Sequence, residues 1–301
     1  MTMAKAKMTV VRAALVGPMC AWAACSNPVD SAANELPWLS EREVVDEVEV
    51  TPEEVSPVGC DDCLTVGRWY RFDTLALTTI DGKEHPVIET LNGLWAADIT
   101  DNQLDIMLEV TAVSATELQA RVMNGARIDG TDDICKLPST SVELVFPRSG
   151  CRLERSNESP FNVYAGTETY PKNCTTTLPV HHAIPVSRAQ LEGTFSEDCG
   201  RIIAGKVPSG GLGQLELGET CTCLTLGGKP ASDCAPLDAS YVNDNGKCDG
   251  CNANYKELGQ LLEAFGTVDW LCKTEDDRPA ACLTADFTAV AMTGAPPDCE
   301  P

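Results

Sequence analysis

Sixteen cysteines in a chain of 301 residues limit what this protein can fold into more than any other feature. Half of them lie between Cys221 and Cys299, a density typical of domains that are held together by disulfides. Such domains occur where the surroundings are oxidising. The cysteines therefore predict a disulfide-stabilised fold, provided that the chain carries a segment that exports it.

An export segment occupies the first residues. An apolar run, AALVGPMCAWAACS, covers residues 13–26 and follows Lys5, Lys7 and Arg12 with no acid before it. A basic leader, a short apolar region and small residues at its end are typical of a secretory signal peptide. About 12 apolar residues at ~1.5 Å each extend only ~18 Å, which is too short for a membrane span. We expect residues 1–24 to be a signal peptide.

The end of this run, Trp22-Ala23-Ala24-Cys25, resembles the lipobox of bacterial lipoproteins, although that motif usually has Leu where Trp22 stands. The resemblance covers residues 1–26 only and identifies no family for the rest of the chain. It implies that Cys25 is lipidated and becomes the first residue, and two or more acyl chains suffice for stable anchoring. The alternative is ordinary cleavage after Ala23, which leaves a soluble secreted protein.

Cysteine parity favours lipidation. Cys20 leaves with the signal peptide, so cleavage after Ala23 leaves 15 of the 16 thiols, an odd number. Lipidation of Cys25 leaves 14, enough for seven disulfides. The disulfide candidates are Cys60, Cys63, Cys135, Cys151, Cys174, Cys199, Cys221, Cys223, Cys234, Cys248, Cys251, Cys272, Cys282 and Cys299.

The chain is strongly acidic, with a formal net charge of −23 that becomes −26 once Lys5, Lys7 and Arg12 are removed. Nucleic acids and anionic lipids require basic patches, so we expect neither as a partner. Attachment to a membrane would come from the lipid anchor, at the outer membrane or the cell surface. Nine acids, one base and four prolines between residues 26 and 59 predict that 25–59 is an acidic, disordered tether.

Apolar and polar residues alternate from residue 60 to residue 207. Runs such as 104–111, 117–122 and 142–146 have apolar side chains at every second position, as in strands with one buried face. No helical period stands out. The turn-forming pairs are Asp81-Gly82, Asn92-Gly93, Asn124-Gly125 and Asp129-Gly130. The pattern predicts a mainly β domain of the β-sandwich or jelly-roll type.

Residues 208–301 predict a smaller, cysteine-rich and partly helical region. Apolar residues at helical spacing indicate a helix over 255–265, and a weaker helix is expected over 279–289. A boundary near Pro208 leaves six cysteines before it and eight after it, so each part can pair its own thiols. Connectivity cannot be deduced from sequence, and a disulfide across this boundary stays open.

Two C-x-x-C pairs, Cys60 with Cys63 and Cys248 with Cys251, are interpreted as structural disulfide cysteines. A zinc site would need both pairs close together in the chain, and they lie far apart. A redox dithiol would need a helix start in a βαβ unit, which neither pair has. The one histidine pair, His181-His182, is assigned to an ordinary strand, whose successive side chains point to opposite faces.

Acid-rich loops are weak metal candidates, and calcium is the cofactor that they would hold; no other cofactor is expected. The candidate ligands are Asp129, Asp132, Asp133, Asp244 and Asp249. The second loop is not an EF-hand, because Tyr241 and Asn252 stand where that motif needs acids. Solvated turns are the alternative for both loops.

Familiar catalytic motifs such as G-x-S-x-G, H-E-x-x-H and the phosphate loop do not occur. Whether the chain is an enzyme stays open, with the balance against it. We expect a cell-envelope lipoprotein whose ectodomain has a binding or structural role toward an extracellular protein or glycan. Trp69, Tyr70 and Trp95 are either rings that stack on a sugar or core residues. The alternatives are an exported hydrolase that uses two carboxylates and a calcium-dependent adhesion module.

Overall fold

The structure is a computed structural model of the whole chain, and it describes residues 59–128, 131–164, 169–171, 183–222, 251 and 256–299. The predicted signal peptide, Cys25 and all of the predicted tether except Gly59 lie outside the described residues. Strands dominate what is described, and the mainly β prediction is confirmed.

The elements follow one another as β1 (Trp69–Ile80), α1 (Val87–Thr100), β2 (Asp105–Val113), β3 (Glu117–Arg127), β4 (Ile134–Lys136), a 3-10 turn (Pro138–Thr140), β5 (Val142–Ser149), β6 (Arg152–Leu153), β7 (Ser159–Tyr164), β8 (Thr169–Pro171) and β9 (Ala183–Thr194). They continue as β10 (Arg201–Gly213), α2 (Gln214–Gly218), β11 (Thr220–Thr222), β12 (Lys256–Glu257), α3 (Leu258–Phe265), β13 (Cys272–Lys273) and β14 (Pro279–Ala291).

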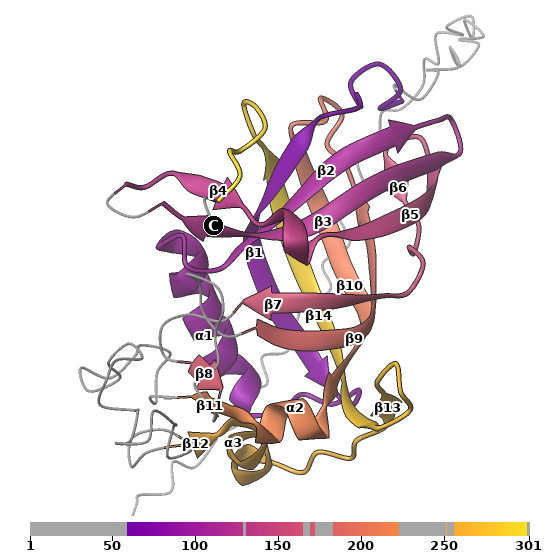
Figure 1. The fold of residues 1–301 in the computed structure, drawn as a ribbon. Coiled ribbons are helices and arrows are strands. Elements are labelled where there is room, and N and C mark those ends of the chain that lie inside the picture. Colours follow the sequence, from indigo (N-terminus) through magenta and orange to yellow (C-terminus); the bar gives the residue numbers. More distant parts are fainter. Residues whose placement is uncertain are drawn as a thin grey trace, which may run out of the picture. The chain divides into compact units, whose positions relative to one another are not determined.

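The main sheet closes on itself (Figure 1). Neighbours are paired in the order β1-β2-β3-β5-β6-β9-β10-β14, and β14 pairs again with β1 along most of its length. Each pairing in this circuit is antiparallel, and β4, β7 and β13 pair in addition with β3, β9 and β14. A sandwich of two facing sheets is not confirmed, because β1 joins β14 to β2 and leaves no free edge between them.

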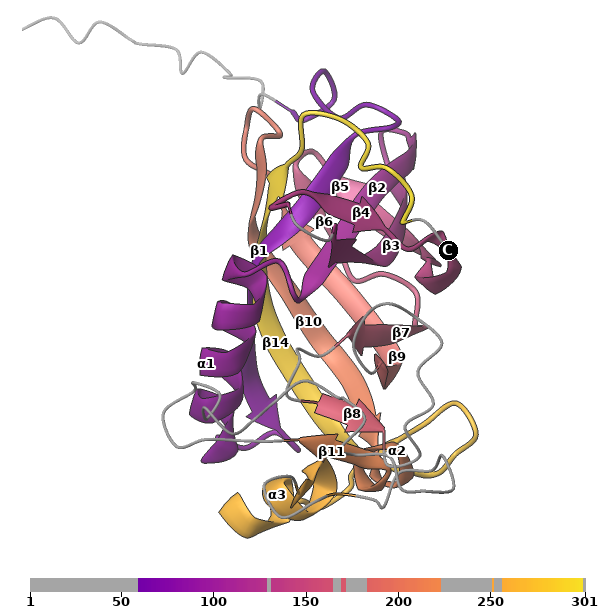
Figure 2. The same cartoon turned by 60° about the vertical axis from the view of Figure 1, so that its left-hand side comes forward.

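Helix α1 lies along β1 where the sequence predicted only turns (Figure 2). Strand β1 pairs with β2 only over Trp69–Arg71, so the backbone of Leu77 has no strand on that side. The side chain of Asn92 supplies both bonds, since its Oδ1 accepts from Leu77 N at 2.7 Å and its Nδ2 donates to Leu77 O at 3.0 Å. The pair Asn92-Gly93 therefore marks a helix that substitutes for a strand neighbour, and the turn prediction was wrong.

Two other turn-forming pairs have different outcomes. Asp81 and Gly82 do form a turn, with φ values of 50° and 72° that suit these residues. Asn124 and Gly125 lie inside β3 instead. A Cβ on Gly125 would come within 2.7 Å of Met107 Cε, so this glycine permits close packing across two strands.

The C-terminal segment differs from its prediction in part. The helix expected over 255–265 is confirmed as α3, which begins at Leu258 and ends before Gly266. The weaker helix expected over 279–289 is wrong, because these residues form β14. Alternate side chains of β14, from Leu283 to Ala289, are buried in the interior of the sheet. Alanine favours a helix when the local sequence is considered alone, but here the pairing of β14 with β1 and β10 decides the conformation.

The predicted domain boundary at Pro208 is not found. Strand β10 runs from Arg201 to Gly213 without a break, and β14 from the C-terminal part lies between β1 and β10. The described residues on both sides of Pro208 belong to one compact unit. The separation of 60–207 from 208–301 is therefore corrected to a single closed sheet that needs both.

Ten of the predicted disulfide cysteines are bonded in the part of the chain that the structure describes. Cys60 and Cys63 do not pair with each other and reach different partners, as structural cysteines do. One disulfide crosses residue 208, so even parity on each side did not reveal the connectivity. Cys174, Cys223, Cys234 and Cys248 lie outside the described residues. The pairs are Cys60–Cys151, Cys63–Cys199, Cys135–Cys299, Cys221–Cys251 and Cys272–Cys282.

Candidate binding cavity inside the closed sheet

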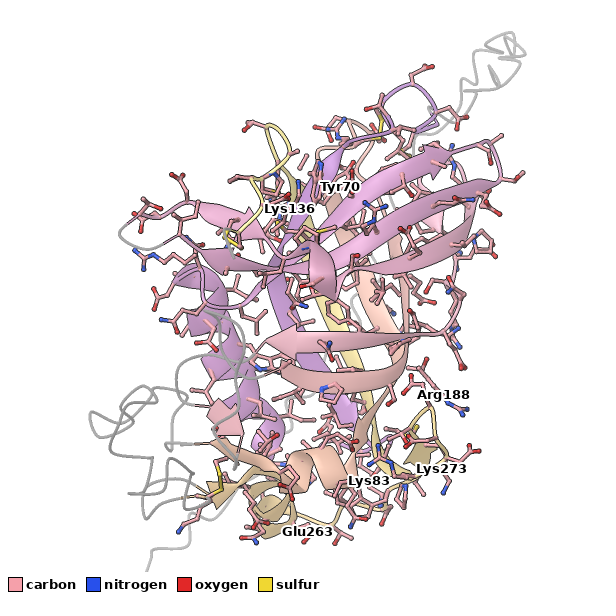
Figure 3. All side chains as sticks on the ribbon, viewed as in Figure 1. Tyr70, Lys83, Lys136, Arg188, Glu263 and Lys273 are labelled. Atoms are coloured by element: carbon pink, nitrogen blue, oxygen red, sulfur yellow. A yellow bond between two sulfur atoms is a disulfide. The ribbon has the colours of Figure 1, made fainter. Side chains whose placement is uncertain are left out.

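One end of the sheet interior is filled by aromatic rings. Tyr70, at the start of β1, is completely buried and its ring contacts that of Phe195, with centroids 5.2 Å apart. The Tyr70 hydroxyl donates to Cys199 O at 2.9 Å, and burial raises the pKa of Tyr70 to about 12. Tyr70 lies toward this end, while Lys83 and Glu263 lie at the opposite end (Figure 3).

A buried guanidinium completes the packing there. Phe146 and Arg148 occupy alternate buried positions of β5, and the Arg148 side chain has no exposed surface. Its Nη2 pairs with Asp61, which lies between Cys60 and Cys63. Both of these cysteines are disulfide-bonded, so the segment that carries Asp61 is held over the sheet. We call Tyr70, Phe146, Arg148 and Phe195 the filled end.

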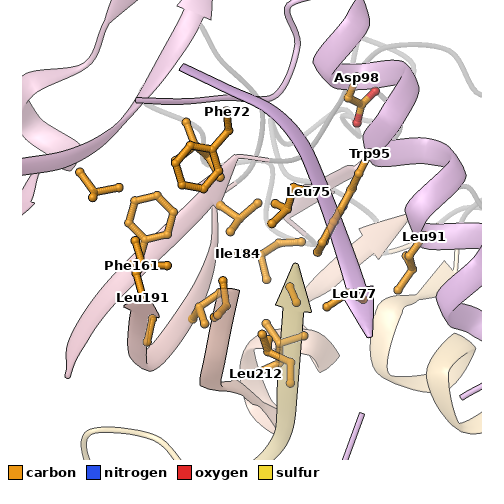
Figure 4. Close-up of a pocket in the computed structure, with 18 of the residues that line it drawn as sticks. Phe72, Leu75, Leu77, Leu91, Trp95, Asp98, Phe161, Ile184, Leu191 and Leu212 are labelled. Atoms are coloured by element: carbon orange, nitrogen blue, oxygen red, sulfur yellow. The ribbon is translucent and has the colours of Figure 1, made fainter. Parts of the chain in front are cut away.

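The rest of the interior contains a cavity of about 120 Å³ (Figure 4). Its wall is built by the central and later parts of β1, by inward residues of the other long strands, and by helices α1 and α3. Leucine, isoleucine, valine and alanine side chains make up most of the wall. Representative residues are Leu75, Trp95, Leu144, Phe161, Leu191 and Leu283.

This cavity is too large to be a packing defect, and its wall is too apolar to hold ordered water. A single water needs roughly 10–15 Å³ of such volume together with 2–4 polar partners. The cavity is about as large as engineered apolar cavities of roughly 150 Å³, which stay dry and bind benzene or xenon. An eight-stranded closed sheet has an interior that either side chains fill or one small ligand occupies. Here side chains fill one end of the interior and leave a cavity in the rest.

Three polar side chains reach the wall: Asp98 of α1, Ser159 of β7 and Thr222 of β11. Asp98 is only 7% exposed. Its backbone carbonyl accepts from Gln103 N at 2.7 Å and from Leu104 N at 3.2 Å, which holds this turn of the helix against the start of β2. Asp98 and Thr222 also interact elsewhere in the fold. The wall is thus apolar with a few placed polar groups, as is usual for small-molecule sites.

Helix α3 contributes Leu258 and Leu262 to the wall, and a buried carboxylate holds the segment that follows it. Asp81, in the turn after β1, accepts hydrogen bonds from four backbone amides. The donors are Asp269 N at 2.7 Å, Trp270 N at 3.1 Å, Leu271 N at 3.4 Å and Cys282 N at 2.7 Å. This arrangement ties the chain after α3 to both β1 and β14, so α3 is a fixed part of the wall.

The predicted calcium ligands are not gathered in the described part of the chain. The Asp132 carboxylate accepts from Arg127 Nη2 at 2.7 Å, and Asp133 is exposed. Asp129, Asp244 and Asp249 lie outside the described residues, as do His181 and His182. The closest metal-like grouping among described residues is Cys60, Cys63 and Cys199, and disulfides account for all three sulfurs.

The aromatic residues considered as sugar-stacking rings lie in packed clusters or at the cavity wall. Trp69 and Tyr70 are 3% and 0% exposed and belong to packed clusters, so neither can stack on a sugar. Trp95 lines the cavity. Among the described residues of the wall, Asp98 is the one carboxylate, and the two-carboxylate arrangement of a hydrolase gains no support from this cavity.

Sequence reasoning missed the cavity and most of its wall. Alternation in β2, β3 and β5 did identify inward residues such as Ile106, Val122 and Leu144. The alternation did not indicate that a cavity remains between these side chains in the interior. The apolar residues of α1 at Leu91, Leu94 and Trp95 have helical spacing, and they were the available signal.

No helix in the described part of the chain is long and apolar enough to cross a membrane. Comparison of the chain with protein-family models, with curated protein sequences and with solved structures finds no match.

Proposed function

We propose that this chain is an exported binding protein whose closed sheet holds a small apolar molecule, and that Cys25 anchors it to the cell envelope by lipid. The cavity inside the sheet is the observation that carries the binding role. Export accounts for the disulfides, which indicate an oxidising and extracellular environment. The lipid anchor rests on the lipobox-like residues 22–25 and on cysteine parity.

A small ligand fits this interior better than the protein or glycan considered from the sequence. Sugars present many hydroxyl groups, and each one that is buried without a partner is costly. The described wall offers only Asp98, Ser159 and Thr222 as polar side chains. An apolar ring or a short alkyl chain needs no polar partner and gains from leaving water.

Thermal unfolding in the presence of a small apolar probe tests this function. Toluene at about 100 times its Kd would stabilise the folded state by roughly 2.7 kcal/mol. A domain of roughly 150–250 residues shifts its Tm by about 2–4 °C per kcal/mol, so the expected rise is roughly 5–10 °C. A probe that leaves the Tm unchanged up to its solubility limit would contradict the proposal.

Two variants connect the shift to the cavity. Ala285→Leu adds a larger side chain at a buried wall position of β14, and it should abolish the toluene response while the protein stays folded. Ala120→Leu is the matched control, because Ala120 is fully buried in the same sheet and does not line the cavity. It should lower the Tm of the free protein and keep the toluene response.

Mass spectrometry of the protein isolated from its producing cell tests the anchor. A lipidated N-terminus at Cys25 is the expected result. An unmodified N-terminus at Ala24 would remove the anchor from the proposal and leave the binding role standing.

A further inference from the structure

Aromatic side chains reach the cavity from three different elements. They are Phe72 of β1, Trp95 of α1 and Phe161 of β7. Figure 4 shows Phe72 and Phe161 on one side of the pocket and Trp95, which projects from α1, on the other. The wall therefore offers aromatic surfaces together with aliphatic ones, and a molecule inside the cavity would lie among rings.

The ring of Phe72 is fixed by packing on the side away from the cavity. It stacks on Phe287 of β14, with ring centroids 4.2 Å apart and an angle of 4° between the ring planes. Phe287 in turn lies against Gly205 of β10, where an added Cβ would come within 2.4 Å of the Phe287 ring. Phe287 does not line the cavity, whereas Phe72 does. Phe287 thus covers one face of Phe72, and the cavity meets the other face or the edge of this ring.

The filled end shows how rings pack in this sheet where no space is left. Tyr70 and Phe195 contact each other there, with ring centroids 5.2 Å apart. At the cavity, the rings of Phe72, Trp95 and Phe161 border open volume. A ring supplied by a ligand would take the part that a second aromatic side chain takes at the filled end.

We propose that the natural ligand is an aromatic molecule built on a single six-membered ring, which pairs with Phe72, Trp95 and Phe161. This inference rests on the proposed binding function and narrows its ligand class. The cavity of about 120 Å³ is close in volume to engineered cavities that hold benzene. Aromatic pairs in offset-stacked or edge-to-face arrangements gain stability beyond the apolar area that they bury. An alkyl chain or a saturated ring of the same size gains from burial alone.

A comparison of toluene with methylcyclohexane tests the inference. The two probes have the same carbon skeleton, and only toluene is aromatic. Headspace gas chromatography over solutions of the purified protein gives the affinity of each volatile probe. The same measurement over hexadecane gives its transfer into an apolar medium without rings, and dividing by this value removes the difference in hydrophobicity between the probes.

After this correction, toluene should bind at least about threefold more tightly than methylcyclohexane, as one aromatic pair between ligand and wall requires. A smaller corrected ratio, with at least one probe bound, would overturn the inference and leave the proposed function intact. Failure of both probes to bind would overturn both.

Substitution then assigns the preference to the rings. Trp95→Leu replaces the indole with an aliphatic side chain and should lower the corrected ratio by at least about twofold. Leu191→Ala is the matched control, because Leu191 is an aliphatic wall residue of β9, and its truncation enlarges the cavity without removing a ring. It should leave the ratio unchanged, since the added volume serves both probes alike.

A corrected ratio that is as high in Trp95→Leu as in the unmodified protein would contradict the pairing of the ligand with Trp95. If this variant does not fold, Phe161→Leu makes the same test from β7. The ratio measured on the unmodified protein decides the ligand class in either case.

Discussion

The filled end and the cavity belong to the same closed sheet, and their inward residues follow the same alternation along the same strands. Tyr70, Phe146 and Phe195 occupy the first with large rings. Aliphatic residues such as Leu144 and Leu283 line the cavity and leave its volume open. A closed sheet of this size thus holds a packed core or a ligand site according to the volume of a few side chains. The two ends should respond differently to equivalent changes.

The largest difference is expected for disulfides. Cys63–Cys199, at the filled end, has a sequence separation of 136, and Cys272–Cys282, at the other end, has one of 10. Loop-closure entropy predicts a loss of about 5 kcal/mol for the first and about 3 kcal/mol for the second when both cysteines become alanine. Denaturant unfolding measures both losses. Equal losses would show that chain entropy does not govern these bonds.

The ion pair at the filled end should be asymmetric. Asp61→Ala leaves the buried Arg148 guanidinium without its partner, and breaking a buried pair in this way costs roughly 3–5 kcal/mol. We expect a value at or below the low end of this range, since the Asp61 side chain is 63% exposed. Arg148→Met removes the buried charge, so Asp61 no longer has to neutralise it. This variant should therefore destabilise the protein less than Asp61→Ala. The reverse order would mean that the guanidinium itself supports the packing.

Enlarging an alanine should have opposite effects at the two ends. Ala120 is completely buried in β3 and does not line the cavity, whereas Ala285 is buried in β14 and does. Ala120→Leu overpacks the core and should cost about 1–3 kcal/mol. Ala285→Leu fills open space and should be neutral or add roughly 0.5–2 kcal/mol. Equal destabilisation by both would show that the cavity closes in solution.

The smallest effect concerns pH and the outer face of the sheet. Burial raises the pKa of Asp73, but hydrogen bonds from Thr288 and Arg201 outweigh it and hold that pKa below its ordinary value. A lowered pKa adds stability above about pH 4, the ordinary value, and this stability is lost as the pH falls through the folded-state pKa. Thr288→Val should therefore cost up to about 1 kcal/mol at pH 7 and less at pH 2.

Thr284→Val is the control for this pH dependence. Thr284 bonds to Thr78 and Thr79, with no acid among these partners, so its cost should be the same at both pH values. Thermal unfolding of the two variants at pH 7 and pH 2 makes the comparison. A cost for Thr288→Val that does not change with pH would contradict the role of Asp73.

Sequence patterns predicted the strands well and their arrangement poorly. Period-two alternation identified β2, β3 and β5, because each has one buried face. It failed for β14, whose alanines also favour a helix, and for α1, where Asn92-Gly93 imitates a turn. The error at β14 concerns a segment whose partner β1 is distant in the chain, whereas the error at α1 concerns a helix whose Asn92 bonds to Leu77 only 15 residues before it. Closure of the sheet depends on the pairing of β1 with β14, which local sequence does not encode.

The cavity was beyond prediction for a related reason. Its volume is what remains after residues from nearly every strand are brought together, and no single segment records it. Asp98 was also overlooked, since the chain has 45 acids and only the fold distinguishes one that faces an apolar interior.

A crystal structure of the protein under xenon pressure tests the central claim most directly. Xenon enters apolar cavities that are large enough and dry. The account predicts a xenon peak inside the sheet between Leu75, Leu144 and Leu283, and no peak among the rings of Tyr70, Phe146 and Phe195. A cavity region filled by side chains, or xenon bound only elsewhere, would contradict the claim that this sheet encloses a ligand site.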